Sequence, residues 1–171
     1  MSGSLIKIGS SIASGNPSVL TITGIDTTYN VYEVQVEGII PSSDDTIGWR
    51  VTKGGTVQSD SEYDFAYKSQ PSNASLQNNV NSNQTSWTNA HIESTGNGFF
   101  GTFTLFNWAS ASEFSVGLIE SVAWVSTPQL FGSNGAYIHT VASASDGISF
   151  FFTGGATINN GAELTLYGLK K

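Results

Sequence analysis

The stretch Tyr32-Glu33-Val34-Gln35-Val36-Glu37 alternates an apolar side chain with a charged or polar one at every step. Two further stretches, Ile47–Thr52 and Tyr63–Lys68, have the same period of two. Successive side chains of a β-strand point to opposite faces of its sheet. The alternation therefore predicts half-buried strands, with one apolar face and one polar face.

Short segments of strand character recur along the rest of the chain, and turn residues separate them. About a dozen short strands without a helix of normal length indicate a β-sandwich or barrel, and they exclude alternating β-α units. The other predicted strands are Leu5–Ile8, Val19–Thr23, Ser86–Glu93, Phe99–Asn107, Phe114–Ile119, Val122–Ser126, Tyr137–Ala142, Ile148–Thr153 and Glu163–Leu169.

Composition supports an all-β fold in one domain, residues 1–171. Gly, Ser, Thr and Asn make up 74 of the 171 residues, and charged residues only 11%. Ser, Thr and Asn compete with the backbone for hydrogen bonds and Gly loses backbone entropy, so this composition excludes a charged helical bundle. Most of the remaining apolar residues are β-branched or aromatic, which suits a pleated surface.

Charge and targeting signals restrict the partners. The net charge is −7, and the six basic residues form no stripe beyond the terminal lysine pair, so we expect no nucleic-acid partner. The acidic balance also disfavours anionic membranes. The first 17 residues lack the apolar core of a secretory signal, and no cysteine is present to form a disulfide. A protein made in a host cytoplasm and released inside an assembled particle would have these features.

We expect no catalytic residue, no cofactor and no metal. The only histidines, His91 and His139, lie in strand-like segments without the motif of a catalytic triad or a zinc site, so we expect ordinary strand histidines. Two acidic clusters, Asp44-Asp45 and the alternating Asp60, Glu62 and Asp64, leave a calcium site open as an alternative. A carboxylate pair of a glycosidase is a further alternative.

Three segments depart from the simple strand pattern. The polar stretch Ser69–Thr85 predicts a long loop, of a length that is functional or mobile in many proteins. Phe99–Trp108 and Ile148–Phe152 are apolar on both faces, whereas a strand of a soluble sandwich needs only one apolar face. Either both faces are covered within the domain, or the second face, which includes Phe100, Phe106 and Trp108, contacts another subunit.

Several segments resemble one group of proteins. His139–Ile148 leads to Phe150–Phe152, and after a Gly/Asn loop the chain ends on the strand Leu164–Lys170. The opening Ser4–Ile8 and the strand Tyr29–Gln35 fit the same group. Together these segments resemble the small β-sandwich virion proteins of tailed bacteriophages.

The resemblance implies a jelly-roll-like antiparallel β-sandwich of about ten to twelve short strands, located in the virion. It implies a non-enzymatic capsid decoration (cement) protein that binds the assembled shell, or alternatively a tail or fibre subunit. Because capsids have local three-fold axes, we expect a decoration protein to bind the shell as a trimer. The partner is then the major capsid protein or another virion protein. For the contacts between subunits we expect Phe100, Phe106, Trp108 and Phe151. For the capsid contact we expect Leu5, Ile6, Lys170 and Lys171, with residues 1–17 as an N-terminal arm.

A carbohydrate-binding module is the rival from another functional class. Exposed tryptophan rings would stack on the sugars of a glycan partner. Trp49, Tyr63 and Tyr67 fit core-facing positions of their strands, whereas Trp87, Trp108 and Trp124 stay open as platforms.

Overall fold

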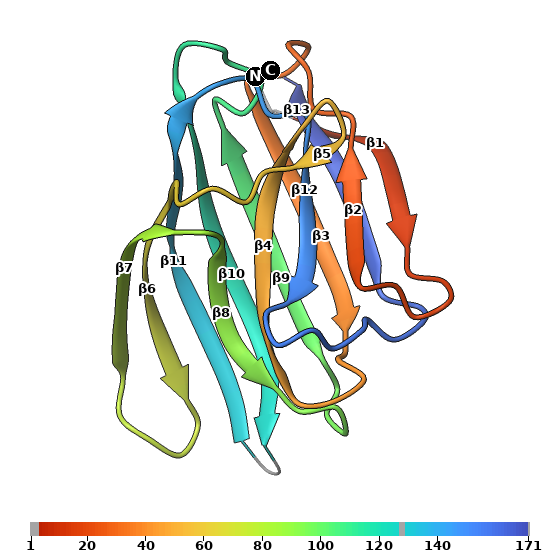
Figure 1. Ribbon diagram of the computed structural model, residues 1–171, viewed down its shortest axis with the longest axis vertical. Coiled ribbons are helices and arrows are strands. Elements are labelled where there is room, and N and C mark those ends of the chain that lie inside the picture. The colour runs from red at the N-terminus through yellow and green to blue at the C-terminus, as the bar shows by residue number, and fades with distance from the viewer. Residues whose placement is uncertain (1–3, 127–128, 171) are drawn as a thin grey trace.

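Figure 1 shows the computed structural model, which describes residues 4–126 and 129–170. These residues form thirteen strands and no helix, which confirms the all-β prediction. The strands are β1 (Ser4–Ile12), β2 (Val19–Thr23), β3 (Val31–Ile39), β4 (Asp45–Lys53), β5 (Thr56–Val57), β6 (Tyr63–Pro71), β7 (Gln77–Gln84), β8 (Trp87–Ile92), β9 (Phe99–Phe106), β10 (Phe114–Ser126), β11 (Gln129–Ala142), β12 (Gly147–Phe152) and β13 (Glu163–Lys170).

The strands form two antiparallel sheets packed face to face (Figure 1). The larger sheet has the order β1-β13-β3-β9-β10-β11-β6-β7, and the smaller has β2-β12-β4-β5, with β8 also paired to β4. From β1 to β4 the chain changes sheet at every step. It changes again between β5 and β6, β7 and β8, β8 and β9, β11 and β12, and β12 and β13. Eight strands form two four-stranded layers, β1-β13-β3-β9 in the larger sheet and β2-β12-β4-β8 in the smaller. This arrangement is a jelly roll, as predicted.

Two hairpins widen the larger sheet beyond β9. β10 and β11 pair with each other along almost their whole length, and β6 and β7 add two further strands beside β11. The smaller sheet receives no such addition. The outer strands of the larger sheet therefore extend past the smaller sheet, as the left side of Figure 1 shows.

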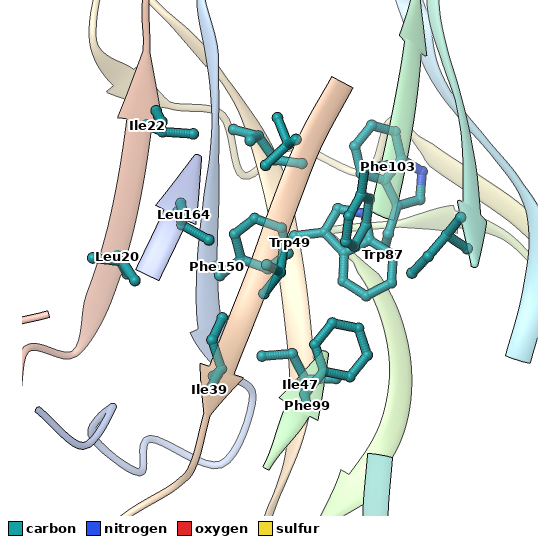
Figure 2. Packing of buried hydrophobic residues seen from close by; sticks show 14 of the residues in the cluster. Leu20, Ile22, Ile39, Ile47, Trp49, Trp87, Phe99, Phe103, Phe150 and Leu164 are labelled. Atoms are coloured by element: carbon teal, nitrogen blue, oxygen red, sulfur yellow. The ribbon is translucent and has the colours of Figure 1, made fainter. Parts of the chain in front are cut away.

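Aromatic side chains join the two sheets in the core. Trp49 of β4 is fully buried, and its ring centroid lies 5.1 Å from that of Phe103 and 4.9 Å from that of Tyr137, both on the larger sheet. Phe150 of β12 packs edge-on against Phe103 at 5.2 Å. Figure 2 shows Trp49, Phe103 and Phe150 together between the sheets. Edge-to-face contacts of this kind contribute beyond simple area burial.

The predicted loop Ser69–Thr85 is wrong. Its first residues belong to β6, and Gln77–Gln84 forms β7, with Val80 opposite Ala66. The Asn and Gln side chains of β7 are largely exposed on both faces, so the segment has no apolar alternation to reveal it. β7 is an edge strand that pairs with β6 through backbone hydrogen bonds. Such pairing does not require apolar side chains, so the amino-acid sequence gives no sign of it.

Two other predicted boundaries change. The segments expected as separate strands around residues 114–126 are one strand, β10, because polar Glu120 and Ser121 continue the alternation. The Ser121 hydroxyl lies 2.7 Å from the Ser133 hydroxyl. Residues 4–12 of the expected N-terminal arm form β1, which pairs with the last strand from Ser4 opposite Lys170 to Ile12 opposite Glu163.

Candidate interaction surface

The outer face of the larger sheet carries many of the large apolar side chains that remain exposed. Val122 of β10 is 44% exposed and lies directly opposite Phe100 of β9, which is also exposed. Leu118 is exposed between Thr104 and Ala136 of the two neighbouring strands. Isolated exposed apolar residues are ordinary, but a contiguous group indicates a contact surface.

The register of the strands arranges this face in rows that cross the sheet. One apolar row contains Val31, Phe106, Val116 and Ile138, each opposite the next on four adjacent strands. A second row continues it with Leu118, Ala136, Ala66 and Val80. We call the outer face of β9, β10, β11, β6 and β7 the apolar half of the larger sheet.

A polar row crosses the same face beside the two apolar rows. One polar residue of each strand stands opposite the next, in the order Ser10, Thr165, Gln35, Thr102, Glu120, Asn134, Lys68, Asn78. Beyond this row the face becomes apolar again at Phe100 and Val122. The apolar rows supply contact area, and the polar row between them can fix the position of a partner through hydrogen bonds. Specific protein interfaces combine these two features.

Shallow hollows mark the apolar half. One lies over Ala66, Val80, Val116, Ala136 and Ile138. Another is lined by residues around Phe100 and Val122. These hollows can receive side chains of a facing protein surface.

The size of the apolar half fits a protein contact. Five strands span about 24 Å across, and the nine residues from Val116 to Trp124 extend about 30 Å along β10. This gives a flat area of about 700 Å², close to the roughly 800 Å² that each partner contributes to an interface of standard size.

The four residues predicted to lie between subunits are at three different places. Phe100 and Phe106 lie on the apolar half, with Phe106 partly exposed. Trp108 is buried, and its Nε1 donates a hydrogen bond to the Val116 carbonyl at 3.1 Å. Phe151 is on the outer face of the smaller sheet, where the Arg50 guanidinium lies 4.4 Å above its ring.

The predicted outward position of Trp108 is wrong because the alternation of β9 ends before it. Asn107 has a left-handed backbone, with φ of 61°, and this turns the chain so that Trp108 enters the core beside Trp87. Phe151 explains the second doubly apolar strand, since Arg50 covers it within the chain. Of the two alternatives for such strands, the structure therefore gives cover within the domain for β12 and an open face for β9.

The residues predicted for the capsid contact gather at the other edge of the larger sheet. Leu5 lies opposite Leu169 and Ile6 opposite Gly168, and both Leu5 and Ile6 are exposed. Lys170 at the end of β13 is exposed beside them. Lys171 lies outside the described residues.

The two histidines have ordinary positions in strands. His139 is buried in β11, with its Nε2 3.2 Å from Oε2 of Glu62, an ion-pair distance without hydrogen-bond geometry. Burial lowers the pKa of the His139 imidazole, and the nearby Glu62 carboxylate only partly opposes this shift. His91 is exposed on β8, and its Nδ1 lies 3.3 Å from the Thr46 hydroxyl.

Several carboxylates of the acidic clusters hold loops in place. Asp45 is buried and accepts hydrogen bonds from the backbone N–H groups of Thr46, Gly154 and Ala156. Asp44 accepts two hydrogen bonds from Ser94, which lower the pKa of the Asp44 carboxyl. Each of these aspartates thus fastens its loop to a segment far away in the sequence.

The alternating acidic cluster does not share one strand face. Asp60 and Glu62 precede β6, whereas Asp64 is in the strand and accepts a hydrogen bond from the Asn83 N–H at 2.7 Å. Within residues 4–126 and 129–170, no group of three or more acidic or histidine side chains is placed to hold a metal ion.

Three of the four tryptophans are core residues. Trp49, Trp87 and Trp108 are buried, and Trp87 donates its indole N–H to the carbonyls of Asp64 and Ile138. Trp124, near the end of β10, is partly exposed. Of the tryptophans left open as sugar platforms, Trp124 alone keeps a surface position.

Comparison with known proteins adds no relative: the chain matches no protein-family model and no curated protein. In the part of the chain that the structure describes, there is no helix long and apolar enough to cross a membrane.

Proposed function

We propose that the chain is a non-enzymatic structural protein of a phage virion, a capsid decoration (cement) protein that binds the assembled shell as a trimer. The observation that supports this proposal is the apolar half of the larger sheet. It combines exposed Phe100, Leu118 and Val122 with a polar row and with an area close to that of a standard interface.

In the proposed trimer, three copies turn the apolar half toward a common axis. Removing Val122, Leu118 and Phe100 from water supplies the driving force for association. The row from Gln35 to Lys68 must then find hydrogen-bond partners on the neighbouring copy, since buried polar groups without partners are costly. This requirement selects one register and makes the trimer specific.

A trimer suits a shell because capsids have local three-fold axes, and a symmetric subunit presents the same contact around such an axis. A protein that binds the intact lattice but not the open one stabilises the lattice by mass action. At a free concentration of 100 times the dissociation constant, each occupied site contributes about 2.7 kcal/mol.

The test is reconstitution of the chain on shells assembled from a phage major capsid protein, without any other decoration protein. We expect the chain to co-sediment with the shells in multiples of three copies and to raise the temperature at which they break. Val122→Lys should abolish both effects, whereas Val19→Lys on the smaller sheet should leave them unchanged.

Other outcomes would contradict the proposal. A chain that ignores shells but binds purified tails would be a tail or fibre subunit. A chain that ignores both and binds polysaccharide with a change of Trp124 fluorescence would be a carbohydrate-binding module.

A further inference from the structure

The first strand of the chain forms an open edge of the larger sheet. In the described residues the only ladder partner of β1 is β13, so the other side of its backbone pairs with no strand. β7 forms the opposite edge, on the far side of the molecule in Figure 1. Such an edge is a row of unpaired N–H and C=O groups that can pair with another extended chain.

The side chains of β1 are unusual for an open edge. Leu5 is 45% exposed and Ile12 is 61% exposed, and Ile6 and Ile8 between them are also exposed. Natural edge strands are protected by charged side chains, prolines or bulges. In β1 the protection consists of Lys7 and one bulge between Lys7 and Gly9.

The opposite edge provides an internal comparison. β7 consists of Gln, Asn and Ser apart from Val80, and its side chains are largely exposed. Both edges therefore offer backbone groups, but only β1 adds a row of apolar side chains. An extended segment that settles on β1 would bury Leu5, Ile6, Ile8 and Ile12, whereas on β7 it would bury mainly amides.

Charge distinguishes a foreign segment from a second copy. Lys7 lies on the edge strand opposite Tyr167, and it makes no ion pair with a described residue. The rest of the chain is strongly acidic, with 13 acidic residues against six basic ones. An antiparallel pair of two β1 strands centred on Ile8 would place the two Lys7 side chains about 7–8 Å apart as diagonal neighbours, which is repulsive.

We propose that the β1 edge binds an extended segment of another protein, which joins the larger sheet as an additional antiparallel strand. Successive apolar residues of the segment point to opposite faces of the sheet. Those on one face cover Leu5 and Ile12, and those on the other face cover Ile6 and Ile8. The segment carries a carboxylate opposite Lys7. This mode of recognition takes affinity from main-chain hydrogen bonds and specificity from alternate side chains. The site is separate from the apolar half and stands whether or not the chain binds a shell.

The probe is a soluble nine-residue peptide of valine and threonine, added to the isotope-labelled full chain. It carries one glutamate at the position that faces Lys7 when the peptide pairs antiparallel with Ser4–Ile12. We expect amide chemical shifts to change and hydrogen exchange to slow along Ser4–Ile12. The amides of β7 and of the apolar half should not change. A peptide with lysine in place of glutamate should bind about 2- to 5-fold more weakly, which corresponds to one cross-strand charge pair.

Matched variants separate the two edges. Leu5→Lys with Ile12→Lys alters β1, and Leu76→Lys with Asn81→Lys alters the β7 side away from the apolar half, all at exposed positions. We expect the β1 variant to lose at least tenfold in peptide affinity and the control to keep it. Unchanged amide chemical shifts in the rest of the chain show that each variant is folded. The peptide titration of the natural chain tests the proposal even if a variant does not fold.

Several results would overturn the proposal. They are the absence of any peptide effect on β1, an equal effect on β7, or equal affinity of the two variants. Shell binding by the β1 variant at the natural level would show that shells do not use this edge, and the proposed function would remain.

Discussion

Replacing Val122 by threonine removes apolar contact area from the centre of the proposed interface while it keeps the shape and the β-propensity of the side chain. The chain offers a matched control. Val19 on β2 is 41% exposed, against 44% for Val122, but it belongs to the smaller sheet. Both substitutions change the same atoms at nearly the same exposure, and only one of them lies on the apolar half.

The expected magnitude follows from the exposed fraction. Full burial of a valine side chain contributes about 1.5–3 kcal/mol, so burial of the exposed 44% of Val122 contributes about 0.7–1.3 kcal/mol per subunit. For three subunits the loss is about 2–4 kcal/mol, since every copy carries the substitution. The midpoint concentration of a monomer–trimer equilibrium varies with the square root of the dissociation constant of the trimer. Val122→Thr should therefore raise the midpoint concentration roughly 5- to 30-fold.

Sedimentation velocity over a dilution series measures this midpoint directly. Val122→Thr should shift the transition and Val19→Thr should leave it within about twofold of the natural chain, since surface substitutions away from special features have small effects. Equal shifts for both variants, or no shift for Val122→Thr, would refute the assignment of the interface to this face.

Three further predictions concern the stability of the single chain. Trp49→Ala should lower the free energy of unfolding by about 3–5 kcal/mol in urea titrations, because it empties the contact between the sheets. Gly135→Ala should cost about 1–3 kcal/mol in the same assay, since a β-carbon there would overlap the backbone and Cβ of Tyr67, whereas Gly132→Ala has room. For His139, stability should be constant above about pH 6.5 and fall below it, because the folded chain resists protonation of the buried imidazole. His139→Gln should remove that fall in the urea midpoint.

Each of these predictions has a contrary result. A Trp49→Ala loss below about 1 kcal/mol would mean that the sheets close over the gap. Equal unfolding energies for the two glycine variants would show that β6 moves aside without cost. If the urea midpoint rises as the pH is lowered from 7 to 5, the Glu62 carboxylate outweighs the effect of burial and holds His139 in its charged form.

The alternation of apolar and polar residues made the sandwich predictable. Tyr32, Val34 and Val36 do face the core, as do Trp49 and Val51. Period two reports a strand wherever one face is buried, because burial selects side chains at every second position. β7 escaped prediction because neither of its faces is buried.

The interaction surface was only partly predictable. Phe100 and Phe106 follow from the doubly apolar character of β9, but the other side of the apolar half is built by register. Ala66 lies at the level of Leu118 and Ala136 only because β6, from a distant part of the chain, is aligned with the β10–β11 hairpin. The alignment of strands that are distant in the sequence cannot be predicted from the local alternation of residues. Trp108 shows the related limit, since one left-handed residue, Asn107, reversed the face that alternation assigned.

The most direct test of the central claim is the solution mass of the natural full-length chain, measured by light scattering behind a sizing column over a wide range of concentration. Assembly through the apolar half predicts three copies of the 18.1 kDa chain at high concentration. A dimer would keep the interface and contradict the three-fold arrangement. A monomer at every concentration would contradict assembly of the free chain through this face.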